Sequence, residues 1–146
     1  MSRVEIHQSK VSDLSSLDMR TQEIEMFSYL PSDHAAELIE NSISWTNKIE
    51  DKIISIIGFF DLWPGVCQIW ALPDKSINKY IRSHLRCVNK MMEEHFYNSS
   101  RHRMQTFSLN DDLHNRWMGW LNFEFEGTMK RYGPEHKDYN IWAKVK

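Results

Sequence analysis

Residues 66–72 constrain the fold more than any other segment, because VCQIWAL is apolar at nearly every position. A strand with one face in water alternates apolar and polar residues, whereas a strand covered on both faces can be apolar throughout. Pro73 ends the run, and from Ser76 to about Tyr97 apolar residues recur every three or four positions. We therefore expect a central strand, followed by a long amphipathic helix that packs on its sheet.

The remaining elements follow from the same two periodicities. Turns are expected at Glu50-Asp51 and at Trp63-Pro64-Gly65. The order of elements predicts the α+β class: a single domain over residues 1–146, with a central, mixed, mostly antiparallel sheet flanked by helices. Alternation predicts strands near residues 4–8, 45–49, 53–60, 104–109, 123–129 and 139–143, and helical spacing predicts helices over 13–29, 33–43 and 112–122.

Size and charge exclude several classes of protein. A chain of 146 residues and 17.5 kDa corresponds to one domain. The formal net charge of -2 provides no global attraction to nucleic acid or an anionic membrane, so a nucleic-acid partner is disfavoured. The longest uncharged apolar stretch, residues 53–60, is far shorter than the roughly 20 residues of a membrane-spanning helix. No secretion signal is recognisable at the N-terminus, so we expect a cytoplasmic protein without a membrane partner.

The two cysteines argue against a disulfide or a metal site. Cys67 and Cys87 are twenty residues apart and form no CxxC pattern, so in the cytoplasm they are expected to be reduced thiols. Cys87 lies in the middle of the expected long helix, where a buried, inert thiol is the usual outcome. No pair of histidines or carboxylates has the spacing of metal ligands, and we expect no metal.

Four local features carry a resemblance to a known family. A hairpin runs into an apolar strand that ends at Leu72-Pro73, and a long helix follows. A later strand ends at Asn110, and the short helix after it ends in WLNF, residues 120–123. FEFEG at 123–127 and KDYNIW at 137–142 complete the pattern. In these features the chain resembles the GCN5-related N-acetyltransferase (GNAT) superfamily. Its six tryptophans and five glycines are similar in style to short GNAT-like proteins of tailed bacteriophages, of the internal virion protein A type.

The resemblance implies a site for acetyl-CoA. The family's signature Q/R-x-x-G-x-G/A is absent, because no glycine occurs between Gly65 and Gly119. Side chains at Lys79 and Ile81 would crowd a pyrophosphate that bare glycines admit, so weakened binding is expected. Lys75, Lys79 and Arg82 would offset phosphate charge. The implied cofactor residues are Trp70, Ala71 and Leu72 through their backbone, and Ser76, Ile77, Asn78, Lys79, Tyr80 and Ile81 at the phosphates.

The catalytic residues are less sharply indicated. Many members of the family carry a proton-donating tyrosine five residues before the phenylalanine of the short helix, and this chain has Met118 there. A thioether cannot donate a proton. His114 is a candidate general base, and Asp61 and Gln68 are candidates for a base or a water-holding group. The competing interpretations are a surface histidine and two polar residues at strand ends.

Two functions therefore compete. The first is transfer of an acetyl group from acetyl-CoA to an amine acceptor, with an acceptor and oligomeric state that the sequence leaves open. The second is a noncatalytic GNAT-fold phage protein that serves as a virion component or binds a host protein. Trp63, in a turn, is the best candidate for an exposed protein contact, and we expect it to be more exposed than Trp70. Four cations at helical spacing are interpreted as a solvated helix face: Lys79, Arg82, Arg86 and Lys90.

Overall fold

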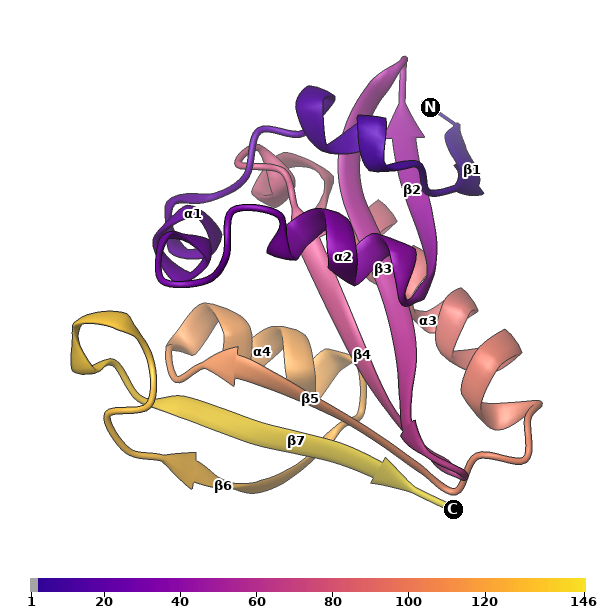
Figure 1. The fold of residues 1–146 in the computed structure, drawn as a ribbon. Helices are drawn as coiled ribbons and strands as arrows, with labels where there is room; N and C mark the ends of the chain where they lie inside the picture. Colours follow the sequence, from indigo (N-terminus) through magenta and orange to yellow (C-terminus); the bar gives the residue numbers. More distant parts are fainter. Residues whose placement is uncertain (1–2) are drawn as a thin grey trace. The chain divides into compact units, whose positions relative to one another are not determined.

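The computed structural model describes residues 3–146, and its seven strands form one mixed sheet in the order β1-β2-β3-β4-β5-β7-β6 (Figure 1). Strands β4 and β5 pair in parallel, whereas β1 with β2, β2 with β3, β5 with β7 and β6 with β7 pair antiparallel. The expected α+β class, with a mixed, mostly antiparallel sheet, is confirmed, and β4 lies inside the sheet as expected. The strands are β1 Val4–Gln8, β2 Ile43–Ile49, β3 Lys52–Trp63, β4 Val66–Pro73, β5 Arg103–Leu109, β6 Glu124–Met129 and β7 Tyr139–Val145.

The long helix expected after β4 is present as three consecutive helical segments. A 3-10 turn leads into an α-helix, and a π-helical turn ends it, so the helical path runs from Ile77 to Tyr97. The other helices are shorter. The helical segments are η1 Val11–Ser16, α1 Thr21–Ser28, α2 His34–Glu40, η2 Ile77–Tyr80, α3 Ile81–Met92, η3 Glu93–Tyr97, α4 Asp112–Trp120 and η4 Pro134–His136.

The single helix expected over residues 13–29 is wrong. Between η1 and α1 the backbone is extended at Leu17 and Arg20. The amide of Asp18 donates to the carboxylate of Asp74 at 3.1 Å, and the amide of Lys75 donates to the carbonyl of Asp18 at 2.7 Å. These long-range bonds replace the local bonds of a continuous helix. The helix expected over 33–43 also ends early, because residues from Ile43 onward form β2.

The chain divides into two compact units. The first comprises the residues up to Phe60 and Trp70–Val88, and the second comprises Asp61–Ile69 and Asn89–Lys146. A single domain over residues 1–146 stays a prediction, and residues 1 and 2 of that range lie outside the described part.

In the first unit, side chains at alternating positions of β3 lie in different environments. Ile56 joins an apolar cluster, whereas its neighbour Ser55 is fully buried among polar groups. Ser55 Oγ accepts from Asn47 Nδ2 at 3.1 Å and lies 2.9 Å from His84 Nδ1. The cluster consists of Leu17, Ile39, Ile53, Ile56 and Leu72, with Leu14, Met19, Phe27 and Trp70 packed against it. Burial of each large aliphatic side chain contributes roughly 1.5–3 kcal/mol.

Glycine at position 58 is required by Trp70. A Cβ atom on Gly58 would lie 2.2 Å from the indole ring, so only glycine lets Trp70 lie across β3. The indole Nε1 donates to Ser42 Oγ at 3.0 Å. Trp70 is half-buried, whereas Trp63 is 62% exposed, which confirms the expected ranking of the two tryptophans.

Candidate functional site

The parallel pairing of β4 with β5 is short. It joins residues 66–68 to residues 103–105, and Thr106 Oγ1 then donates to the carbonyl of Ile69 at 2.9 Å. Within residues 3–146, no further pair extends this ladder to Trp70, Ala71 or Leu72. A strand edge without a ladder partner offers backbone N–H and C=O groups to a ligand that contains amides. The strand residues implied by the resemblance therefore lie on such an edge.

The turn after β4 is fixed by a buried carboxylate. Asp74 is 1% exposed and accepts from the amide of Ser76 at 2.9 Å, from Ser76 Oγ at 2.5 Å and from the amide of Asp18 at 3.1 Å. Lys52 Nζ lies 3.6 Å away. Burial alone would raise the pKa of Asp74, but the hydrogen bonds from Ser76 and Asp18 and the charge of Lys52 lower it below its usual range. The turn is therefore ordered without glycine.

The side chains implied at the phosphates differ in exposure. Ile77 is 1% exposed and packs in the interior, so it fills the core instead of covering the turn. Asn78 and Lys79 are exposed, and Ile81 is half-buried. Lys79 Nζ lies 5.6 Å from the ring centroid of Tyr80. The obstacle expected at Lys79 is therefore a mobile cationic side chain in water, which is a weaker barrier than a packed residue.

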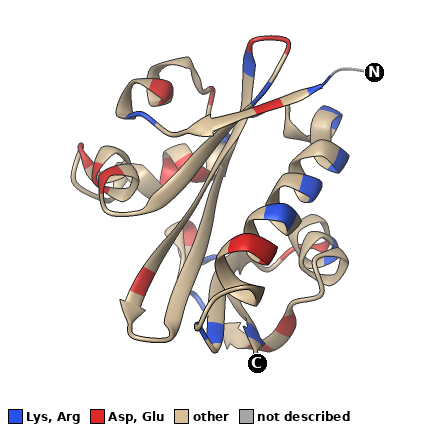
Figure 2. Cartoon of the chain, turned by 90° about the vertical axis from the view of Figure 1, so that its right-hand side faces the viewer, with Lys and Arg blue, Asp and Glu red and all other residues tan. Residues whose placement is uncertain are grey.

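Exposed cations continue from this turn along the helix. Lys75 is paired with Asp18 at 3.2 Å, and Lys79 and Arg82 are exposed. Figure 2 shows that Lys and Arg positions recur along α3, and the expected positions Arg86 and Lys90 are exposed. These groups fit coenzyme A: the strand edge can bond the amides of its pantetheine arm, and the cations can offset its phosphates.

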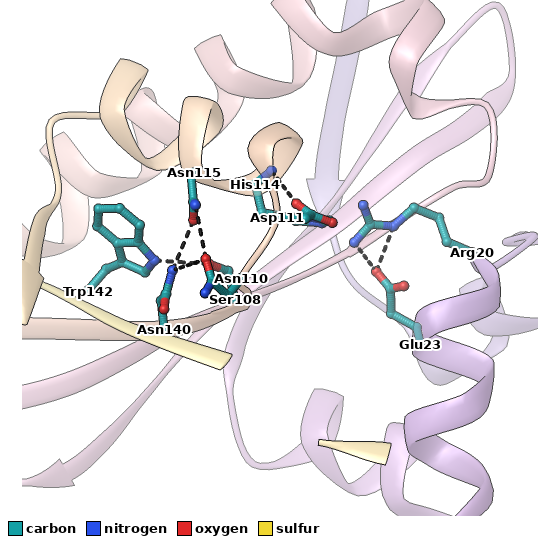
Figure 3. A network of polar contacts seen from close by, with 9 residues as sticks. All are labelled: Arg20, Glu23, Ser108, Asn110, Asp111, His114, Asn115, Asn140 and Trp142. Atoms are coloured by element: carbon teal, nitrogen blue, oxygen red, sulfur yellow. Dashed lines mark hydrogen bonds and ion pairs between the residues drawn. The ribbon is translucent and has the colours of Figure 1, made fainter. Parts of the chain in front are cut away.

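The second unit holds an oriented histidine at the start of α4. Asp111 is the N-cap, and its Oδ1 accepts from the amide of His114 at 2.8 Å and lies 2.6 Å from His114 Nδ1 (Figure 3). The His114 ring packs edge-on against Trp117, with 5.0 Å between the centroids. His114 is 5% exposed, so its interpretation as a surface histidine is wrong. The carboxylate orients the imidazole, as acid–base chemistry requires.

Beside this histidine, the end of β5 and the start of β7 are joined by asparagines. Asn140 Nδ2 donates to Asn110 Oδ1 at 3.1 Å and to Asn115 Oδ1 at 3.0 Å (Figure 3). Thr128 Oγ1 donates to Asn140 Oδ1 at 2.8 Å, and Trp142 Nε1 donates to Ser108 Oγ at 3.0 Å. Sequence reasoning missed Asn115 and Asn140. The signal for Asn140 was its place near the start of an expected strand, whereas Asn115 lies within the expected short helix.

The other two catalytic candidates have ordinary structural roles. Asp61 accepts from Arg101 Nε at 2.7 Å and from Arg101 Nη2 at 3.0 Å on the surface, and these bonds lower the pKa of Asp61. Gln68 is half-buried and is the register partner of Gln105 in the β4–β5 ladder. Asp61 is therefore held in an ion pair, where it would not serve as a base.

Thiol and metal chemistry are not indicated in the described residues. Among the described residues, Cys67 and Cys87 are both buried thiols, as expected for Cys87, and burial raises the pKa of Cys67 to about 11. Among residues 3–146, no group of three or more His, Cys, Asp and Glu side chains is arranged to hold a metal ion. In the same residues, no helix is long and apolar enough to span a bilayer.

Helix α1 carries a carboxylate, Glu23, that the sequence analysis did not single out. Glu23 Oε1 accepts from Arg20 Nε at 2.8 Å and also from Arg20 Nη2 (Figure 3). The side chains of Arg20 and Glu23 are only 15% and 12% exposed. Burial raises the pKa of Glu23 although Arg20 opposes this. No sequence signal could have found it, because its burial depends on tertiary packing.

No protein-family model matches the sequence, and none of the curated proteins matches it either. Solved structures do match. RimL, a ribosomal L7/L12 alpha-N-protein acetyltransferase in complex with coenzyme A, is 15% identical with a TM-score of 0.77, over 97% of this chain and 93% of that one. A GNAT-family acetyltransferase from Bacillus anthracis is 15% identical with a TM-score of 0.71, over 99% and 98%. The ribosomal-protein-S5-alanine acetyltransferase from Vibrio fischeri is 16% identical with a TM-score of 0.68, over 99% and 96%. The chain therefore has the fold of GNAT acetyltransferases.

Proposed function

We propose that this protein is a GNAT-type N-acetyltransferase that transfers an acetyl group from acetyl-CoA to an amine. The observation that carries the proposal is the edge of β4, because the ladder to β5 stops at residue 68 and leaves Trp70, Ala71 and Leu72 beside a turn with exposed cations. Structures with the same fold include complexes with coenzyme A and with acetyl-CoA, which supports the choice of cofactor.

The cofactor site differs from the glycine-bearing signature, and we propose that it binds weakly. Lys79 is exposed and Ile81 half-buried at positions where glycine would leave the amides bare. We expect acetyl-CoA to bind more weakly than the micromolar range, which corresponds to about -8 kcal/mol.

When bound, acetyl-CoA supplies an activated acetyl group, and the chain's own residues manage the proton. The acceptor amine must lose a proton before its nitrogen can form a bond to the acetyl carbon. Asp111 orients the ring of His114 through Nδ1, and we propose His114 as the residue that accepts this proton. Met118 is half-buried and provides no acid for the leaving thiolate, which must then take its proton from water.

The names of two structural neighbours support a proposal for the class of acceptor. The neighbours named above are acetyltransferases of the alpha-amino end of ribosomal L7/L12 and of the alanine of ribosomal protein S5. We propose an aliphatic primary amine as acceptor, with a peptide that begins with alanine and the polyamine spermidine as test substrates.

The second candidate function is protein binding without catalysis, as a virion component or a ligand of a host protein in the cytoplasm. It is favoured by the indole of Trp63, which is 62% exposed at the end of β3, and by Met118 in place of a proton donor. We also propose that the chain forms a single domain and that it originates from a phage.

Incubation of the purified protein with millimolar acetyl-CoA and each test amine, followed by mass spectrometry, tests the first function directly. We expect one acetyl group on at least one amine and none in the absence of protein. A folded protein that binds acetyl-CoA in calorimetry but acetylates neither amine would contradict catalysis and leave the binding function ahead.

A further inference from the structure

Residues 75–92 concentrate positive charge along one helical path. This segment contains five of the chain's 18 Lys and Arg residues and none of its 20 Asp and Glu residues. Lys and Arg positions recur along α3 in Figure 2. A chain with a net charge of -2 therefore carries a segment with a local charge of +5. Four of the five cations recur at helical spacing and are exposed, and we call them the cation row: Lys79, Arg82, Arg86 and Lys90.

The row lacks acidic partners that would neutralise it. Among residues 3–146, Arg82, Arg86 and Lys90 form no ion pair with an Asp or Glu side chain. Lys75, just before the row, does have such a partner, because its Nζ lies 3.2 Å from the carboxylate of Asp18. The charges of these three residues are therefore available to a partner from solution.

The helix that carries the row is fixed in place by its other side. Buried residues of α3 alternate with the exposed cations at helical spacing, and they comprise His84, Leu85, Cys87, Val88, Met91 and Met92. The exposed cations therefore extend from a rigid backbone, which lowers the entropy that is lost when they bind a partner.

The row extends beyond the turn that we assign to the cofactor. An α-helix rises about 1.5 Å per residue, so Arg86 and Lys90 lie about 6 and 12 Å further along α3 than Arg82. One strand of DNA carries a phosphate for about every 3.4 Å of helix axis, so roughly three to four phosphates span the same distance. The row is therefore long enough to contact several phosphates of one strand.

The exposed surface of this helix separates nucleic acid from other anionic partners. The exposed positions from 78 to 90 are all polar, because they comprise only the cation row, Asn78 and Asn89. The core of a protein–protein interface is depleted in charged residues and enriched in aromatic ones, and a helix that binds a membrane surface inserts an apolar face. A polar and cationic row instead fits the sugar–phosphate backbone of a nucleic acid.

The net charge of -2 does not oppose binding at this place. At physiological salt, exposed charges that are more than about 8 Å apart are largely screened from one another. Binding at α3 therefore depends on the charges in and near the row more than on acidic residues elsewhere. Glu93 and Glu94 are exposed directly after α3 and limit the row at that end.

We propose that the cation row is a nucleic-acid-binding surface that contacts the phosphates of one strand without reading its bases. Such binding is independent of base sequence, because phosphate contacts position a protein and carry no sequence information directly. This function lies beyond the proposed acetyl transfer and does not depend on it.

The first test is fluorescence anisotropy of a labelled DNA duplex of about 20 base pairs, titrated with the full chain at about 50 to 200 mM salt. We expect a Kd of about 10⁻⁴ M or tighter at the lowest salt, and a slope of log K against log salt of about -3. The double variant Arg86→Gln, Lys90→Gln removes two phosphate contacts. It should bring the slope closer to zero by about 2 and weaken binding at the lowest salt about tenfold or more. No binding by the parent at the lowest salt would overturn the proposal.

Two matched double variants show whether the row itself binds the DNA. Lys130→Gln, Lys137→Gln removes the same charge from exposed positions between β6 and β7, and it should bind the duplex as the parent does. Arg86→Lys, Lys90→Arg keeps both charges and should retain the affinity within about twofold, since either cation neutralises a phosphate. Circular dichroism checks that all variants are folded. Equal losses in the two glutamine variants, or lost binding in the charge-preserving variant, would overturn the proposal.

Competition with polyglutamate separates nucleic acid from an acidic protein. We expect the duplex to stay bound at equal concentrations of negative charge, because duplex DNA carries one charge per about 1.7 Å of its axis, whereas an extended polypeptide carries one per about 3.3 Å. Displacement of half or more of the duplex by polyglutamate under these conditions would overturn the nucleic-acid assignment in favour of an acidic protein.

Discussion

Two turns of this protein lead from a strand into a helix, and each uses an aspartate differently. In the turn from β4, Asp74 is buried and bonds the backbone of Asp18 and Ser76, whereas neighbouring Asn78 and Lys79 remain exposed. In the turn from β5, Asp111 caps α4 and bonds a buried histidine. In the first turn the buried carboxylate orders the backbone, and the neighbouring side chains are exposed to solvent. The second joins its polar side chains to one another.

The comparison separates two kinds of residue. Asp74 should matter for stability and the exposed residues after it for ligand binding. In the second turn the same groups serve both purposes, because His114 is at once a packed side chain and a candidate base.

The largest expected effect comes from the first turn. Asp74→Ala leaves buried amide donors and Lys52 without their carboxylate, and should lower the free energy of unfolding by about 4 kcal/mol. Urea denaturation measures it. Asp18→Ala is the control, because Asp18 forms an exposed pair with Lys75 and should cost about 1 kcal/mol or less. Equal losses would show that Asp74 does not organise the turn.

The next effect concerns pH in the first unit. Burial, together with the charge of Arg20, lowers the pKa of His84 from 6.5 to about 4. The unfolded chain then binds a proton at a higher pH than the folded chain, so stability is full above pH 6.5 and falls as pH drops toward 4. The loss should reach up to about 3 kcal/mol.

The matched variant for this effect is His84→Asn, which removes the titrating group but keeps a polar side chain near Ser55. Its unfolding free energy should depend less on pH between 6.5 and 4 than that of the parent. Parallel pH profiles of parent and variant would mean that His84 is not buried in its neutral form.

A smaller effect is expected in the second turn. Asp111→Ala removes the N-cap of α4 and should cost about 1 kcal/mol. It also releases His114, so acetyl transfer should fall more than stability does. Asp112→Ala, at an exposed position on the same helix, is the control and should change transfer little. A loss of stability with unchanged transfer would make His114 a structural residue only.

Much of the fold is predictable from local periodicity. Residues 66–72 and the helix after them were identified from apolar spacing, and Asp111 was one of two N-cap residues expected for α4. Asn122, just after α4, has a φ of 62°, a left-handed conformation that asparagine tolerates. These features depend on residues near one another in the sequence.

The features that could not be predicted depend on distant contacts. Helix 13–29 is divided because Asp18 bonds to Asp74 and Lys75, which are far away in the chain. The chain has seven histidines, and nothing local in the sequence indicated that His114 is the one that packs against Trp117. Nothing local distinguished Glu23 from the other carboxylates either. Hydrophobic patterns locate elements, but they do not show which polar side chains those elements enclose.

Backbone amide NMR during a titration with acetyl-CoA tests whether the turn after β4 holds the cofactor. We predict fast exchange, an affinity weaker than micromolar, and the largest shifts at Ala71, Leu72 and residues 78–81. The folded double variant Lys79→Gly, Ile81→Gly should bind more tightly, because bare amides admit the pyrophosphate. Submicromolar binding by the parent would contradict the prediction of weak binding. If the amide chemical shifts of these residues do not change with millimolar acetyl-CoA, the assignment of the cofactor site itself is wrong.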